Sequence, residues 1–411
     1  MILLVEICTN LNDYGVNCGT AKKPTTKQLI VKTKPLIQKF LKDRLKLNIK
    51  SNSTYSQNDY LKLLVHSSIT KNYAEGSSNQ LKAESDIDCL VQGCEPNKRS
   101  CPAGDTVLYH IKKFNENELY SVFDGITDAI IRHAIRARRI PRWVTVAIDF
   151  TDISYYGEKT DPMVVGKDRE NGTNYAHRYA TITIVEGGVR YTLKTLAVGK
   201  MPMHIVVEKL IFHARKLVNI RYVLLDRGFY TVDVLTILKK ADCKYVIPGK
   251  KTTRVENLIR KNDVPSLIRY RVGNNSKYTY TNLVIVNDRE GNKCTFITNI
   301  ENMNTTSEIF KTASALYSKR WGIETTYRVT KHSFLSKTTS KNPIVRLFYY
   351  LLAVSLYNLW QLANMIIPEV NNLKVTKYES QSRIFGSLLK GCLRMLDTGP
   401  PHNIKVQLDW I

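Results

Sequence analysis

Apolar residues recur with a helical period in the first third of the chain. The helices that this period predicts cover residues 25–48, 54–72 and 116–137. A polar stretch at residues 74–79 is expected to interrupt the helical pattern, and the segment 94–104 is expected to be a loop. Residues 1–140 are therefore predicted to form a mainly helical N-terminal region.

The pattern changes to strands at Trp143. Residues 143–149 alternate between apolar and polar, with Asp149 on the face opposite the aliphatic side chains. The elements predicted next are strand 179–185, strand 189–197, helix 204–218, strand 222–225, helix 231–241 and strand 244–247. Strands that alternate with helices in this way predict an α/β fold with a mixed sheet.

Short strand-like runs continue from about residue 250 to about 305 and predict a β-rich insertion. Helices resume after it, and Pro343 is expected to start a long apolar helix at the N1 position that suits proline. The predicted organisation is a helical region 1–140, an α/β domain 141–342 that contains the insertion, and a helical C-terminal region 343–411.

The net charge of the chain limits the classes of partner that it is expected to bind. The 411 residues include 61 Lys and Arg against 36 Asp and Glu, which gives a formal net charge of +25. An excess of this size favours a polyanionic partner, either nucleic acid or an acidic membrane surface. The most apolar run, residues 347–357, is shorter than the roughly 20 residues that a membrane-spanning helix needs. Because the N-terminus also lacks the pattern of a signal peptide, we expect a cytoplasmic protein that binds nucleic acid and no membrane.

Three of the eight cysteines, Cys89, Cys94 and Cys101, lie close together in the sequence. Their spacing differs from the C-x2-C pattern of common zinc sites. Structural zinc and three reduced thiols therefore both stay open as interpretations.

Two aspartates follow predicted strands. Asp226 comes directly after the apolar run 222–225, and Asp149 lies at the end of the first predicted strand. Ligands of open α/β sheets bind beyond the carboxyl ends of the strands, so both residues are candidates for a site there. Asp152 is an alternative for the first aspartate, but Asp149 is preferred because it continues the alternating strand. For Asp226 the alternative is simple capping of turn or helix amides.

A third carboxylate, Glu324, lies in a basic segment with helical spacing. The residues that share its stripe of the predicted helix are Tyr317, Arg320, Glu324, Arg328 and Lys331. A separate apolar stripe, which can anchor the helix, consists of Leu316, Ile323, Tyr327 and Phe334. Residues 311–346 contain eight cationic side chains and one acidic side chain. An exposed ladder of i, i+4 ion pairs is the alternative interpretation, and each pair would add only about 0.3 kcal/mol.

Converging carboxylates repel one another unless cations offset their charge. Two divalent metal ions would do so, and would also activate the nucleophile and stabilise the leaving oxygen of a phosphoryl transfer. Hard oxygen ligands suit Mg²⁺ or Mn²⁺. In this interpretation the cations of the stripe hold a nucleic-acid strand and the metal ions cut it.

Tyr317, Arg320, Glu324 and Lys331 fit the pattern Y-x2-R-x3-E-x6-K, and residues 320–324 read R-W-x-I-E. This signature resembles that of the DDE transposases of bacterial and archaeal insertion sequences, and the resemblance covers about residues 143–342. It implies an RNase H-like catalytic domain in which Asp149, Asp226 and Glu324 are catalytic and bind two Mg²⁺ or Mn²⁺ ions. It also implies that Arg320, Lys331 and Tyr317 contact the DNA backbone. Trp321 would either lie against an unstacked base or pack in an apolar contact, and Arg328 is predicted to bind DNA because it shares the stripe.

The resemblance implies a cut-and-paste transposase of an insertion sequence. Such an enzyme binds double-stranded DNA at terminal inverted repeats, hydrolyses the ends and joins the 3′ hydroxyls to target DNA as a homodimer in a synaptic complex. The alternatives are a related metal-dependent nuclease that cuts without joining, and a non-catalytic DNA-binding protein such as a repressor. Recognition of the DNA ends by residues 1–140 is a further hypothesis, and we expect a prokaryotic, nucleoid-associated protein.

Overall fold

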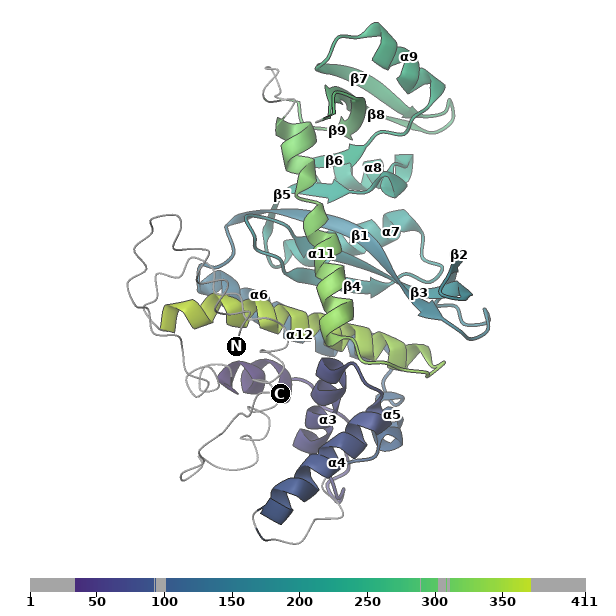
Figure 1. Cartoon of the computed structure of the whole chain (residues 1–411). Coiled ribbons are helices and arrows are strands. Elements are labelled where there is room, and N and C mark those ends of the chain that lie inside the picture. Colours follow the sequence, from purple (N-terminus) through teal and green to yellow (C-terminus); the bar gives the residue numbers. More distant parts are fainter. Residues whose placement is uncertain are drawn as a thin grey trace.

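A mixed β-sheet crosses the middle of the molecule (Figure 1) in the computed structural model, which describes residues 34–91, 93, 101–288, 290–301, 308 and 311–370. Its strands are β1 (Trp143–Tyr155), β2 (Val164–Glu170), β3 (Thr173–Ile184), β4 (Thr192–Ala197), β5 (Asn219–Leu225), β6 (Tyr245–Pro248), β7 (Ser266–Gly273), β8 (Tyr278–Asn287) and β9 (Lys293–Thr298). The strand order is β2-β3-β1-β5-β6-β9-β8-β7, and β4 also pairs with β3. Because β1 is antiparallel to β3 but parallel to β5, the predicted mixed α/β sheet is confirmed.

The first strand is longer than predicted. β1 continues to Tyr155, because residues 149–155 pair without interruption with residues 175–181 of β3. Asp149 therefore lies inside a strand and not at its end. β2 was not predicted at all, since most of its side chains are polar and exposed and show no apolar alternation.

The β-rich insertion extends the central sheet. It consists of β7, β8, β9 and the helix α9 (Thr253–Lys261), which lie at the top of Figure 1. β9 pairs antiparallel with β6, so the insertion covers a strand that would otherwise expose its unpaired backbone at the sheet edge.

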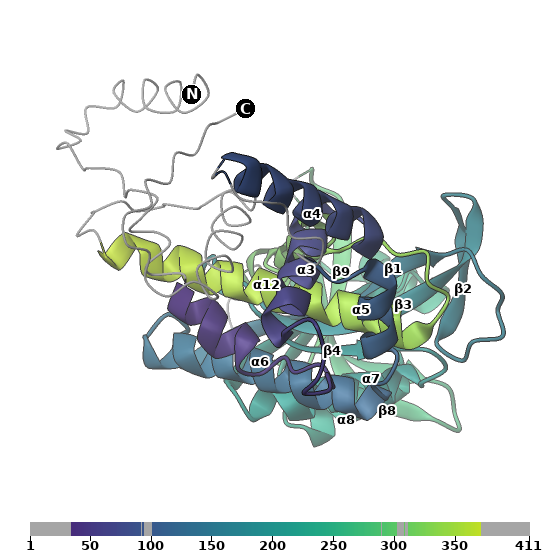
Figure 2. The same ribbon diagram turned by 90° about the horizontal axis from the view of Figure 1, so that it is seen from below.

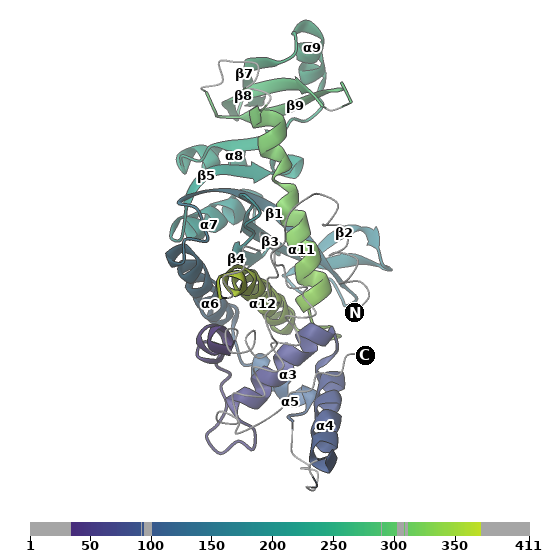
Figure 3. The same cartoon turned by 60° about the vertical axis from the view of Figure 1, so that its left-hand side comes forward.

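Helices cover the two faces of the sheet. Figure 3 shows α11 (Trp321–Val329) on one side and α7 (Met203–Arg215) and α8 (Val232–Lys240) on the other. The long apolar helix α12 begins at Pro343, as predicted, and ends at Val370. It packs along α6 (Glu116–Arg136), and Figure 2 shows the two helices side by side. No helix within the described residues is long and apolar enough to cross a membrane.

The described residues before β1 are mainly helical, but the boundaries of these helices differ from the predicted ones. The described helices are η2 (Gln38–Lys42), α3 (Gln57–Thr70), α4 (Ala74–Val91), α5 (Gly104–Ile111) and α6. Capping boxes at Ser56 and Asn115 start α3 and α6, which confirms two predicted helices. The expected interruption at 74–79 is wrong, because these residues form the first turns of α4. The described part of the first predicted helix ends at Lys42, before its expected end at residue 48, and residues 25–33 lie outside the described ranges.

Candidate active site

Asp149 lies in β1, and Asp226 directly follows β5, the parallel strand beside it. Ile148 pairs with Leu225, so each aspartate is the next residue along its own strand. Alternation places them on the face of Ala147 and Leu224, two residues that pack with α11 in one apolar cluster. Adjacent strands are about 4.8 Å apart, so this register brings the two acids near each other on the side of the sheet that α11 covers, and Asp226 acts on the pKa of Asp149.

Asp152 occupies the other face of β1. It is three residues beyond Asp149, and its carboxylate accepts two hydrogen bonds from Arg178, one from Nε and one from Nη2, both at 2.8 Å. Its charge is therefore used in a bidentate ion pair away from α11. Of the two aspartates considered for this strand, Asp149 is the one on the side of Glu324.

Arg320 links the carboxylate of β1 to the carboxylate of α11. Its Nη1 atom lies 3.1 Å from Oδ2 of Asp149, and its Nη2 atom lies 2.6 Å from Oε1 of Glu324. The Arg320 side chain is only 11% exposed. The i, i+4 ion pair expected from the sequence is present, but it belongs to a buried bridge between two elements and not to an exposed ladder.

Tyr327 and Ile323 fix α11 above the aspartates. The Tyr327 hydroxyl donates to the carbonyl oxygen of Asp149 at 2.6 Å and accepts from Oγ1 of Thr181 at 2.8 Å. Ile323 and Phe334 are fully buried, which confirms the predicted apolar stripe. Gly322 allows the close approach of the helix, because a Cβ atom there would lie 2.9 Å from Cγ1 of Val185.

Sequence analysis missed Glu186 as a supporting residue. Its Oε2 atom accepts from the amide and the hydroxyl of Thr145 on β1, at 3.1 Å and 2.5 Å. Its Oε1 atom pairs with Nζ of Lys319 at 2.5 Å, just before Arg320. Glu186 therefore ties the start of α11 to β1. The sequence offered no signal for this role, because the residue lies in a predicted turn 133 positions before its partner.

The segment around Glu324 is not one regular helix. Wider turns of the π type occur at η4 (Lys311–Leu316) and η5 (Thr330–Phe334), on either side of α11. The predicted stripe of five residues is therefore divided: Arg328 is exposed, whereas Tyr317 packs at 5.2 Å against the Phe296 ring. Trp321, which lies beside the stripe, is exposed as well.

Lys331 turns back toward the sheet. Its Nζ atom donates to the carbonyl oxygen of Asp152 at 2.8 Å, and burial lowers the pKa of its ammonium group. The ammonium group of Lys331, which was predicted to contact DNA, is therefore bound to the backbone of β1 in this structure.

The electrostatics of the site reflect three acids around one buried cation. Burial raises the pKa of Asp149 to about 6, and repulsion from Asp226 and Glu324 acts in the same direction. The Phe150 amide and Arg320 oppose this rise. Burial likewise raises the pKa of Tyr317 to about 12, so this phenol is a hydrogen-bond donor at neutral pH.

The donor set suits a hard divalent metal ion, since it offers carboxylate oxygens from the middle of β1, from the end of β5 and from α11. Among the described residues, no three His, Cys, Asp or Glu side chains are grouped closely enough to form a ready metal site. Asp226 is exposed, and the Arg320 guanidinium binds the other two carboxylates. Arg320 would have to release these oxygens before they could ligate metal.

The cysteine cluster gains no support as a zinc site. Cys101 is buried, Cys89 lies near the end of α4, and Cys94 lies outside the described residues. The choice between structural zinc and reduced thiols therefore stays as the sequence left it.

Comparison with known proteins gives one family and one fold. A family model described as "Transposase DDE domain" matches residues 144–359, which is more than half of the chain. A solved structure of the piggyBac transposase synaptic complex with hairpin DNA is similar, with a TM-score of 0.51 and 12% sequence identity over 94% of this chain and 84% of that chain. At this identity the likeness concerns the fold, and it agrees with the predicted α/β fold class. The comparison with curated protein sequences gives no match.

Proposed function

The chain belongs to the transposase DDE domain family, and on this premise we propose that it is the cut-and-paste DNA transposase of an insertion sequence. It binds the terminal inverted repeats of its element, cleaves the DNA strands at their ends and joins the 3′ hydroxyls to target DNA. It acts as a homodimer in a synaptic complex. Family members generally depend on a divalent metal, and we propose two Mg²⁺ or Mn²⁺ ions for each active site.

One observation carries this proposal. Parallel register places Asp149 beside Asp226, and Arg320 joins Asp149 to Glu324 of α11. Residues separated by 77 and then 98 positions in the sequence thus meet on one face of the sheet. Capping of a turn would explain Asp226 alone, but it would not explain why the carboxylates of β1 and α11 share one cation beside it.

The three carboxylates are proposed to hold the metal ions. When bound, these ions supply activation of a water or a 3′ hydroxyl and stabilisation of the leaving oxygen. Asp149 is fixed for this task by Tyr327 through its own carbonyl and by the Phe150 amide, which donates to its Oδ1 at 2.8 Å. Arg320 then becomes available to bind a phosphate of the DNA, since a guanidinium matches phosphate geometry as well as carboxylate geometry.

Trp321 and Arg328 form the outer part of the proposed DNA-binding surface. Trp321 is 63% exposed, and the Arg320 guanidinium lies 5.9 Å from its ring centroid. An exposed indole beside a cation is suited to stacking on an unpaired base, which favours that role over apolar packing. Tyr317 and Lys331 are partly covered, so their proposed phosphate contacts require a change in their present partners.

A supercoiled donor plasmid that carries the element's own ends tests this function. We expect the protein to excise and transfer the element in the presence of Mg²⁺, and Asp226→Asn and Glu324→Gln to abolish both steps. The matched control is Asp233→Asn, because Asp233 is a partly exposed acid of α8 that forms an ion pair with Lys277.

The products separate the candidate functions. Breakage without strand transfer would favour the nuclease, and binding without metal-dependent breakage would favour the repressor. Wild-type activity in both Asp226→Asn and Glu324→Gln would contradict the proposed site.

A further inference from the structure

A cavity of about 540 Å³ lies between the N-terminal helices and the segment that follows η5. The first turns of α4 and α5 form one wall, residues 337–342 form the other, and Tyr349 of α12 completes it. We call it the lysine pocket after Lys112, Lys337 and Lys341, which line it together with the carboxylates of Glu75 and Asp105. None of these residues belongs to the carboxylate site under α11.

Tyr349 gives the first indication of a ligand. Its side chain is 1% exposed, and its hydroxyl has no hydrogen-bond partner in the structure. A buried hydroxyl without a partner is unfavourable, so such groups in native proteins generally meet a protein atom, a water or a ligand. Burial raises the pKa of this phenol, so the hydroxyl keeps its proton at neutral pH.

The segment 337–340 adds donors in a fixed conformation. Thr338 and Ser340 each accept a backbone N–H through the side-chain oxygen, from Ser340 at 3.1 Å and from Asn342 at 3.2 Å. Each hydroxyl consequently keeps its own proton to donate. Arg346 holds this segment in place, because its Nε atom donates to the carbonyl oxygen of Ser340 at 2.7 Å.

Two helix N-termini meet at the opposite wall. A Cβ atom on Gly104 would lie 2.4 Å from the backbone nitrogen of Glu75, so only glycine permits this approach of α5 to α4. Glu75 is already engaged, since its Oε2 atom accepts the Gly104 N–H at 2.7 Å. The positive ends of both helices and the three lysines favour an anion in the space between the walls.

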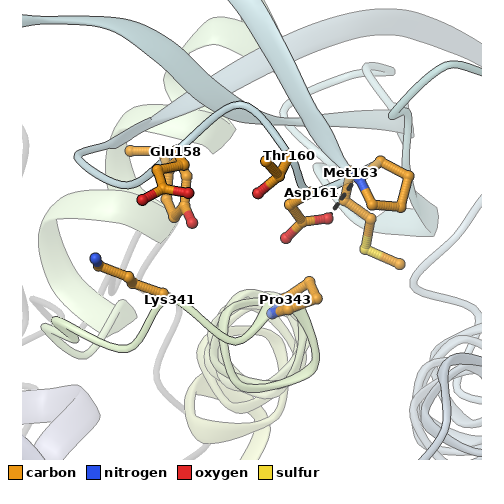
Figure 4. Close-up of a pocket in the computed structure, with 8 residues that line it drawn as sticks. Glu158, Thr160, Asp161, Met163, Lys341 and Pro343 are labelled. Carbon is orange, nitrogen blue, oxygen red and sulfur yellow. Dashed lines mark hydrogen bonds between the residues drawn. The ribbon is translucent and has the colours of Figure 1, made fainter.

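A second cavity differs from the lysine pocket in the charges that line it. It lies on the other side of residues 341–343 and has a volume of about 470 Å³. Figure 4 shows Glu158, Thr160 and Asp161 on the wall opposite Lys341 and Pro343. Two carboxylates against one lysine make this cavity unsuitable for an anion, whereas the lysine pocket combines a cationic excess with hydroxyl donors.

We propose that the lysine pocket binds a backbone phosphate of the element's DNA, away from the carboxylate site. This inference rests on the proposed transposase function, because a basic chain that grips DNA at α11 has DNA phosphates available as the ligand. The pocket directly follows Lys331 and η5 along the chain, so one strand could be held both at the site of cleavage and at the N-terminal helices. Tyr349, Thr338 and Lys337 donate to the phosphate oxygens.

The test compares Tyr349→Phe with Tyr350→Phe. Tyr350 is the next residue, and its hydroxyl is also buried without a partner, but it does not line the pocket. The probe is a short duplex of the terminal repeat, with binding measured in Ca²⁺ so that no strand is cut. We expect Tyr349→Phe to weaken binding about tenfold and to leave the melting temperature unchanged, whereas Tyr350→Phe binds as wild type does.

An exposed variant makes the test independent of folding. Lys337→Gln should lower the slope of log affinity against log salt concentration by about 0.9, the value expected for one phosphate contact. Wild-type affinity in Tyr349→Phe together with a wild-type slope in Lys337→Gln would overturn the proposal. Saturable binding of inorganic phosphate that Tyr349→Phe abolishes, with unchanged DNA affinity, would overturn it too and assign the pocket to a free anion.

The two proposals fail in different ways. If wild-type protein neither binds nor cleaves the terminal repeat, the transposase function is wrong. If the wild type cleaves and joins DNA but both pocket variants bind as it does, only the phosphate site is wrong.

Discussion

At the carboxylate site the cation is buried between two acids that are themselves partly buried. Arg320 is 11% exposed and Glu324 is 37% exposed, and one guanidinium joins residues from a strand and a helix. In the lysine pocket the arrangement is reversed, because the cations are exposed and the hydroxyl of Tyr349 is buried.

This difference separates two uses of charge. A buried ion pair fixes geometry, since either partner alone would be costly to leave in the interior. Exposed lysines contribute little to local geometry, because their side chains stay solvated and mobile. They attract a polyanion with little loss of solvation free energy. We therefore expect changes at the carboxylate site to affect chemistry and stability, and changes in the lysine pocket to affect affinity.

The largest expected effect is on the rate of DNA cleavage, and it should distinguish the two aspartates of β1. Asp149→Asn is expected to lower DNA cleavage at least about a thousandfold, because it removes a proposed metal ligand. Asp152→Asn breaks an ion pair on the opposite face and should leave cleavage within about threefold. Cleavage rates of end-containing plasmid in Mg²⁺ measure both, and the reverse result would move the first ligand to Asp152.

The next largest effect is on the free energy of unfolding and concerns His177 of β3. His177 lies near Arg346, the residue that holds the segment 337–340 of the lysine pocket in place. The His177 side chain is 2% exposed, and burial lowers its pKa to about 4, with Arg346 acting in the same direction and Asp161 opposing it. The unfolded chain binds this proton below about pH 6.5, whereas the folded protein binds it only near pH 4. The free energy of unfolding should therefore fall by roughly 3 kcal/mol as the pH drops from 6.5 to 4.

Chemical denaturation at a series of pH values measures this loss. In His177→Phe the loss should be smaller by the contribution of that residue. His332→Gln is the control, because His332 is exposed, and it should follow the wild-type pH dependence. Parallel pH curves for wild type and His177→Phe would show that His177 does not carry the effect.

A smaller effect, on the affinity of the site for Mn²⁺, is expected when the buried cation Arg320 is removed. Arg320→Met leaves Asp149 and Glu324 without their shared partner, so the site becomes more negative. We expect its affinity for Mn²⁺ without DNA to rise about tenfold. Electron paramagnetic resonance of free Mn²⁺ reports this affinity, with the exposed Arg328→Met as the control. Equal affinities in the two variants would show that Arg320 does not compete with metal.

An effect of similar size concerns the hydroxyl above Asp149. Tyr327→Phe removes a hydrogen bond to the Asp149 carbonyl and one from Thr181, and should lower the free energy of unfolding by about 1 to 2 kcal/mol. Tyr317→Phe is the matched change in the same segment, and should cost less because Tyr317 is only partly buried. Denaturant titration measures both, and an unchanged midpoint for Tyr327→Phe would contradict its anchoring role.

Sequence analysis predicted most of the α/β order, because apolar alternation and helical period are local signals. It found β5, β6, α7, α8 and the start of α12. It missed α5 and α9. It also missed the strand β2, because the mostly polar side chains of β2 show no apolar alternation. The predicted regular helix around Glu324 was wrong at both ends, because π-type turns lie on either side of α11.

The sequence by itself determined which groups could act: a strongly basic chain, one aspartate in an alternating strand and one after an apolar run, and the spacing of Tyr317, Arg320, Glu324 and Lys331. These properties are local, so they survive without knowledge of the fold. Only the tertiary structure decided which aspartate faces α11, that Arg320 is buried between two acids, and that Lys331 turns to β1. Those facts depend on strand register and helix packing, which join residues far apart in the chain and therefore leave no pattern in any short stretch of it.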